Sequence, residues 1–157
     1  MKNITIYTDG SCHTQHKIGA WAAILLIGDE EIVLSGKKAE TTHNRMELLS
    51  VIKAFEYIDN HKFTDYKIVI KSDSQYVVGI RERKEKLKAA EFITKKGNQI
   101  QNKDLVEQLI SFIETMNVQF VKVKAHLKKT DNRNYNRDVD KLSRQIVRDY
   151  VRNINFE

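Results

Sequence analysis

The sequence predicts an α/β protein with a mixed β-sheet flanked by helices. Three strand-like segments follow one another at the start of the chain, and strand-like and helical segments alternate after them. Strands joined by short turns pair antiparallel, whereas strands separated by a helix pair parallel, so this order favours a mixed sheet. The 157 residues contain no proline, no repeat and no low-complexity linker. We therefore expect one domain over residues 1–157.

The first three strands are expected to be antiparallel. Residues 3–8 are β-branched and aromatic, residues 21–27 are apolar, and residues 30–37 alternate loosely between polar and apolar. Gly28 and Asp29 separate the last two segments, as in a β-hairpin.

The apolar spacing then changes from two residues to three and four. In residues 44–60 it predicts an amphipathic helix with Asn44 as its N-cap. The remaining elements are expected in this order: a strand at 66–72, a short helix from Ser74, a basic helix and loop at 81–96, a helix at 103–116, a strand at 118–124 and a helix at 136–152.

Positive charge is concentrated in one segment. The formal net charge is +6, and residues 81–103 hold eight Lys or Arg against three Glu, a surplus of five. A concentrated basic surface is typical of proteins that bind nucleic-acid phosphates. A solvated helix face with interleaved Lys and Glu gives the same pattern, so charge alone favours neither interpretation.

The cellular compartment is inferred from cysteine content and hydropathy. Cys12 is the only cysteine, so no disulfide forms within the chain, as is common in reducing compartments. The longest apolar run, residues 20–27, is too short to cross a bilayer, and no segment has the pattern of a signal peptide. We therefore expect a cytoplasmic protein that does not bind membranes.

Four carboxylates occupy positions that a mixed sheet would bring together. Asp9 and Asp73 each follow a strand, Glu47 lies one turn into the first long helix, and Asp140 lies early in the last. Converging carboxylates repel one another unless divalent cations bind between them, and oxygen ligands select Mg²⁺ or Mn²⁺. Each also has a local explanation: a turn for Asp9, a capping box for Glu47, and a helix N-terminus for Asp73 and Asp140.

Four sequence blocks stand out along the chain: TDGSC at 8–12, TTHNRMEL at 41–48, SDSQYV at 72–77, and VKAH at 123–126 followed by NRDVDKLSR at 136–144. Together they resemble type 1 ribonuclease H, and in particular the bacterial ribonuclease HI form. One block alone is weak, but four in the family's order across nearly the whole chain are specific. The resemblance implies the ribonuclease H fold, a five-stranded mixed sheet in the order 3-2-1-4-5 flanked by helices, with a basic handle region at residues 81–103.

The resemblance also implies an endonuclease that hydrolyses the RNA strand of RNA–DNA hybrids with two Mg²⁺ ions, or Mn²⁺ in their place. The implied metal ligands are Asp9, Glu47, Asp73 and Asp140, with Asp138 as the alternative to Asp140. One ion would activate the attacking water and the other would stabilise the leaving 3′ oxygen, which gives 5′-phosphate and 3′-hydroxyl ends. His126 is the implied catalytic histidine, which assists proton transfer or product release.

Substrate contacts follow from the same resemblance. The residues implied are Gly10, Ser11, Cys12, Gln15, Thr42, His43, Asn44, Gln75 and Asn136 around the site, and Arg83, Lys84, Lys86 and Lys88 in the handle region. They would recognise the 2′-hydroxyls and the shape of the hybrid rather than its bases. The family resemblance also implies a monomer, and we expect a stand-alone protein.

The chain departs from the family pattern at a few positions. Gln15 and His43 stand where the family usually has Asn, the handle region has Leu87 and Phe92 in place of tryptophans, and the loop after His126 is longer and more basic. No carboxylate is changed, so we expect an active enzyme. Three alternatives stay open: a binding module without catalysis, another nuclease or polynucleotidyl transferase on the same fold, and a domain of a reverse transcriptase.

Overall fold

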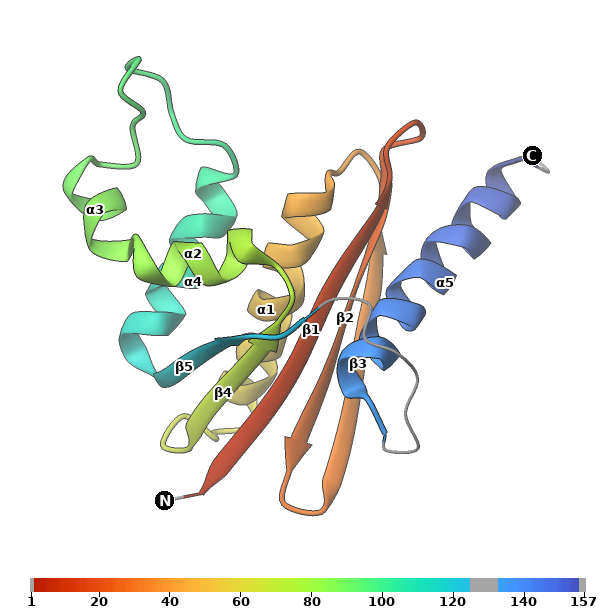
Figure 1. Ribbon diagram of the computed structural model, residues 1–157, viewed down its shortest axis with the longest axis horizontal. Coiled ribbons are helices and arrows are strands. Elements are labelled where there is room, and N and C mark those ends of the chain that lie inside the picture. The colour runs from red at the N-terminus through yellow and green to blue at the C-terminus, as the bar shows by residue number, and fades with distance from the viewer. Residues whose placement is uncertain (1, 125–132, 156–157) are drawn as a thin grey trace.

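The computed structural model describes residues 2–124 and 133–155, which form an α/β fold (Figure 1). In chain order the elements are β1 (Asn3–His13), β2 (Ile18–Ile27), β3 (Glu30–Lys38), α1 (His43–Asn60), β4 (Lys67–Ser72), α2 (Gln75–Glu82), α3 (Lys84–Ala89), α4 (Lys103–Thr115), β5 (Asn117–Lys122) and α5 (Tyr135–Asn155). None of the described helices combines the length and the apolar character needed to cross a bilayer.

The strands form one mixed sheet in the order β3-β2-β1-β4-β5, as predicted. The pairs β1–β2 and β2–β3 are antiparallel, and the pairs β1–β4 and β4–β5 are parallel. Thr8 of β1 lies opposite Ser72 of β4. The next residue of each chain segment is an aspartate, so the topology places Asp9 and Asp73 side by side.

The two faces of the sheet are covered unequally. On β2, Leu25 belongs to a large apolar core that includes α1, α2 and α4, whereas Ile24 belongs to a small one that includes α5. This alternation is the period of two that a strand buried on both faces requires. Figure 1 shows α5 alone on its side of the sheet, with α1 and α4 on the other.

Strand β1 extends beyond the predicted end at residue 8. Asp9 pairs with Ala22 and Gly10 with Trp21, and the strand continues to His13. The interpretation of Asp9-Gly10 as a turn is therefore wrong, because pairing with β2 overrides the local turn preference of this dipeptide. Since β4 ends at Ser72, β1 is paired at Asp9 with β2 alone and no longer with β4.

The N-caps of two helices differ from those predicted. Thr42 caps α1, and its Oγ1 accepts a hydrogen bond from the backbone N–H of Arg45 at 3.3 Å. The predicted Asn44 cap is wrong, because residue 42 is the one with the extended backbone that a cap requires. Ser74 caps α2 in the same way, with Val77 as donor. Capping therefore explains neither Glu47 nor Asp73.

Candidate active site

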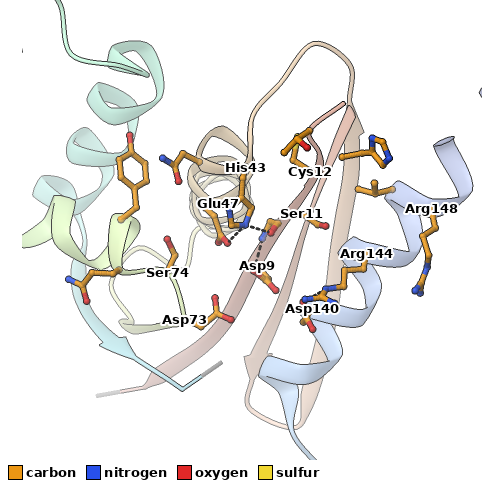
Figure 2. A pocket seen from close by; sticks show the side chains of 17 residues that line it. Asp9, Ser11, Cys12, His43, Glu47, Asp73, Ser74, Asp140, Arg144 and Arg148 are labelled. Atoms are coloured by element: carbon orange, nitrogen blue, oxygen red, sulfur yellow. Dashed lines mark hydrogen bonds and ion pairs between the residues drawn. The ribbon is translucent and has the colours of Figure 1, made fainter. Parts of the chain in front are cut away.

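Three carboxylates meet at the end of the sheet where β1 and β4 lie side by side. Asp9 comes from β1, Glu47 from α1, and Asp73 directly follows β4. One carboxylate oxygen of each lies within 4.8 Å of the others. Figure 2 shows the three side chains pointing toward one another across the base of a groove.

Gly10 allows β1 and α1 to approach closely enough to form this cluster. A Cβ atom at Gly10 would lie 2.5 Å from the backbone nitrogen of Glu47 and 2.5 Å from the backbone carbonyl carbon of Met46. Both are backbone atoms, so neither can move aside without shifting the helix. The absence of a side chain at Gly10 therefore sets the position of Glu47 relative to Asp9.

The cluster concentrates negative charge and is mostly buried. Asp9 is 4% exposed and Glu47 is 2% exposed. Burial, followed by the negative charges of Glu47 and Asp73, raises the pKa of Asp9 to about 10. Among the described residues, the buried Glu47 Oε2 has no hydrogen-bond partner.

These features fit a hard divalent cation. An all-oxygen ligand set suits Mg²⁺ or Mn²⁺, and a cation would neutralise the repulsion that keeps Asp9 protonated. It would also give the orphaned oxygen of Glu47 a partner. The residues that could hold it here are Asp9, Glu47 and Asp73.

His43 covers Glu47 from the solvent side. Its Nε2 lies 3.1 Å from Glu47 Oε1 and 3.0 Å from the carbonyl oxygen of Gly10. The hydrogen bond to Glu47 raises the pKa of His43 above its ordinary value. The imidazole of His43 therefore links α1 to β1 at the edge of the cluster.

Asp140 faces the same groove from α5, on the opposite side of the sheet from α1. It stands outside the group of three, and its Oδ1 forms an ion pair with Arg144 Nε at 2.9 Å. Asp138 turns away, and its Oδ2 pairs with Arg133, which also binds Glu31 on β3. Of the two candidates for the fourth acid, Asp140 is the one that lines the groove.

The groove has a volume of about 830 Å³ and is lined by six of the other residues implied by the resemblance. They are Gly10, Ser11, Cys12, His43, Asn44 and Gln75. The remaining ones lie elsewhere: Thr42 caps α1, Gln15 is in the turn after β1, Asn136 is buried at the start of α5, Arg83 lies between α2 and α3, and Lys84, Lys86 and Lys88 are on α3. His126 lies outside the described residues.

Several residues that line the groove were missed by the sequence analysis. They are His13, Thr14, Ser74, Tyr76, Arg144, Val147 and Arg148. Arg144 and Arg148 follow Asp140 at intervals of four, which places all three on one side of a helix. Both arginines lie outside the basic window at 81–103, and their helical spacing does not show as a concentration of charge in the linear sequence.

Comparison with known proteins identifies the family. A family model described as RNase H matches residues 1–148. The chain belongs to the ribonuclease H family. A ribonuclease H from Alcanivorax borkumensis is 38% identical over 127 residues, which cover 80% of this chain and 82% of the relative. A ribonuclease H from Prosthecochloris aestuarii is 35% identical over 149 residues, or 94% and 97% of the two chains.

A solved structure supports the fold. It is described as LC9-RNase H1, a type 1 RNase H with the type 2 active-site motif, and it matches with a TM-score of 0.79 at 23% identity, over 94% of this chain and 72% of that one. The ribonuclease H family acts endonucleolytically on the RNA of RNA–DNA hybrids and uses a divalent metal. The chain is therefore a ribonuclease H hydrolase, as the resemblance implied.

Proposed function

We propose that this protein cleaves the RNA strand of RNA–DNA hybrids with two Mg²⁺ ions and leaves 5′-phosphate and 3′-hydroxyl ends. The observation that carries the proposal is the cluster of Asp9, Glu47 and Asp73 at the base of an open groove, where one buried oxygen of Glu47 has no partner in the described part of the chain. Bound cations supply charge neutralisation at the scissile phosphate and activation of water.

Asp140 is the fourth acid of the proposed site. It lies across the groove from Glu47 and Asp73 and is held by Arg144 (Figure 2). Asp9 would serve both ions because it lies between Glu47 and Asp73 on one side and Asp140 on the other (Figure 2). Its carboxyl must lose the proton that burial favours before it can bind a cation. His126 is proposed to assist proton transfer or product release.

The substrate would enter along the groove. Backbone and side-chain groups of Gly10, Ser11 and Cys12, together with Asn44 and Gln75, line it within reach of the cluster. We assign them to the sugar edge of the RNA strand, since recognition of a hybrid requires 2′-hydroxyl contacts. His43 adds a donor at the same edge. Gln15, Thr42 and Asn136 are proposed as outer contacts.

The handle region would bind phosphates at a distance from the chemistry. Arg83 lies at the junction of α2 and α3, and Lys84, Lys86 and Lys88 belong to α3. Such contacts strengthen binding without sequence preference and weaken as salt is raised. The protein is proposed to act as a monomer made of one domain.

Cleavage of defined duplexes tests the function. An end-labelled RNA–DNA hybrid is incubated with Mg²⁺, Mn²⁺ or a chelator, beside single-stranded RNA, duplex RNA and duplex DNA. We expect cleavage of the hybrid's RNA strand alone, only with a divalent cation, and with ends of the stated chemistry. Asp9→Asn should abolish it. Asp138→Asn is the matched control, because this carboxylate points away from the groove and should leave cleavage nearly unchanged.

Two outcomes would contradict the proposal. Cleavage that persists in chelator would exclude a metal-dependent mechanism. A hybrid that binds tightly but stays intact with either cation would make the protein a nucleic-acid-binding module.

A further inference from the structure

The exposed face of α5 carries five basic residues in one line. We define the basic stripe as Arg137, Lys141, Arg144, Arg148 and Arg152. At about 100° per residue these positions fall within an arc of about 80°. Lys141, Arg144, Arg148 and Arg152 are exposed, and Arg137 is half-buried. The acidic residues of α5 lie outside this arc.

Most of these charges have no carboxylate partner among residues 2–124 and 133–155. Arg144 binds Asp140, and Arg148 donates to the Gln145 side-chain oxygen at 2.9 Å. Arg137, Lys141, Arg148 and Arg152 form no ion pair with a carboxylate among the described residues. Like charges three and four residues apart disfavour a helix, so the stripe does not serve the stability of α5.

The handle region differs in this respect, although its sequence is also basic. Lys88 binds Glu114 at 2.8 Å, and Lys84 and Lys103 also have carboxylate partners. Part of the handle charge is therefore neutralised within the fold, whereas in the described part of the chain only Arg144 of the basic stripe has a carboxylate partner.

The basic stripe is continuous with the candidate active site. Arg144 and Arg148 line the groove that holds the carboxylate cluster, and a second hollow beside it is lined by Arg137, Lys141 and the same two arginines. Figure 2 shows Asp140, Arg144 and Arg148 following one another along α5, across the groove from Glu47. A rise of 1.5 Å per residue puts Arg148 about 12 Å beyond Asp140, which a strand covers in roughly three to four nucleotides.

We propose that the basic stripe of α5 binds the phosphates of the cleaved RNA strand on the side of the scissile bond away from the handle region. This inference rests on the proposed function. The strand nearest Asp140 is the one being cut, so the phosphates that follow along α5 belong to that strand. The stripe and the handle region then hold the hybrid from opposite sides of the candidate active site (Figure 1).

Binding measurements on Arg148→Ala test the inference. The dissociation constant for a labelled hybrid is measured without divalent metal, as a function of salt. We expect the dissociation constant to rise roughly three- to ten-fold. The slope of its logarithm against the logarithm of the salt concentration should become smaller by about one. Arg148→Lys should restore the slope. Lys62→Ala, which removes an exposed charge beyond the far end of α1, is the matched control and should change neither value.

Shortening the substrate identifies the strand. The RNA strand is trimmed from its 5′ end or its 3′ end while the DNA strand is kept intact. For the native protein, trimming from one end should raise KM, and in Arg148→Ala this effect should be lost with kcat unchanged. An Arg148→Ala variant that matches Lys62→Ala would overturn the inference. So would an Arg148→Ala defect that persists on RNA trimmed from both ends, since the contact would then be to DNA.

The Arg148→Ala experiments can be distinguished from the cleavage test of the proposed function. Failure of the native protein to cut any hybrid would remove the proposed function itself. Native cleavage together with an Arg148→Ala variant of unaltered affinity and salt slope would remove only the role of the basic stripe.

Discussion

Replacing Asp9 with Asn should stabilise the metal-free protein while it abolishes cleavage. Burial and two neighbouring carboxylates raise the pKa of Asp9 to about 10, against an ordinary value of 3.8. The native state therefore holds a proton at pH 7 that the unfolded chain releases. Holding it costs about 1.4 kcal/mol per pH unit between 3.8 and 7, or at most about 4 kcal/mol in total. Asn carries no such cost and keeps an oxygen for the Gly10 N–H, which now donates to Asp9 Oδ1 at 2.9 Å.

The pH dependence gives the sign of the effect. Because the native pKa lies above the unfolded value, the free energy of unfolding of the native protein falls as pH rises from about 4 to about 10. The advantage of Asp9→Asn should therefore widen by up to about 1.4 kcal/mol per pH unit in this range. For a chain of this length, 4 kcal/mol corresponds to a rise in Tm of roughly 8–16 °C.

Urea unfolding in EDTA at pH 5.5, 7 and 8.5 measures this difference. Added Mg²⁺ should narrow it, since a bound cation stabilises the native protein more than the variant. Asp138→Asn is the control and should cost at most about 1 kcal/mol, as its ion pair with Arg133 is largely exposed. Equal midpoints for Asp9→Asn and the native protein at pH 8.5, or a gap that does not grow with pH, would refute the reasoning.

Three further predictions concern packing and charge. Gly10→Ala should cost about 3 kcal/mol or more and remove cleavage, because its Cβ would meet the backbone of α1 at 2.5 Å; thermal unfolding and the hybrid assay measure both effects. Asp140→Asn should reduce cleavage at least about 100-fold, since one proposed metal ligand is lost; the single-turnover rate on a hybrid measures this. Arg45→Ala should cost about 0.5–1 kcal/mol at pH 7 through loss of its two-pronged pair with Asp104. Arg45 lowers the pKa of Asp104 to about 2, so this cost should disappear as pH falls from about 4 to about 2; urea unfolding in that range measures it.

Gly10→Ala has a matched control, and each of the three predictions has a result that would contradict it. Gly79→Ala, whose new Cβ meets nothing closer than 3.8 Å within α2, should be neutral or stabilising by up to about 1 kcal/mol. A Gly10→Ala protein of native stability would show that the contact is not tight. An unchanged single-turnover rate in Asp140→Asn would remove this residue from the proposed site. A cost of Arg45→Ala that is the same at pH 2 as at pH 7 would exclude the ion pair as its source.

Periodicity and motif order were sufficient to predict most of the fold. The change from strand spacing to helical spacing placed α1, α4 and α5 within a few residues of their observed ends. The strand order was implied by the family resemblance and is confirmed. The predicted end of β1 was wrong because Asp9-Gly10 is a strong local turn signal. The pairing that keeps this dipeptide extended is with β2, more than ten residues away in the sequence.

The candidate site shows a similar limit. Thr42 and Asn44 are both good cap residues. Which of them caps α1 depends on where the turn after β3 ends, and in this turn Glu40 has a φ of 50°. Whether the carboxylates of Asp9 and Glu47 lie close together depends on how closely α1 approaches Gly10. That contact can be seen only in the folded structure. The basic stripe went unnoticed because acidic and apolar residues dilute it in the linear sequence.

The unequal covering of the sheet has a consequence for how the molecule opens. Helix α5 is attached through a small apolar cluster around Ile24 and Val139, separate from the large core beneath α1 and α4. Segments with little buried apolar contact detach at lower free energy than the rest. Amide protons of α5 should therefore exchange with solvent sooner than those of α1 or β1. In the proposed site, a cation bound by both Asp9 and Asp140 would link α5 to β1 and oppose this local unfolding. Only molecules in which α5 is packed on the sheet would then turn over substrate.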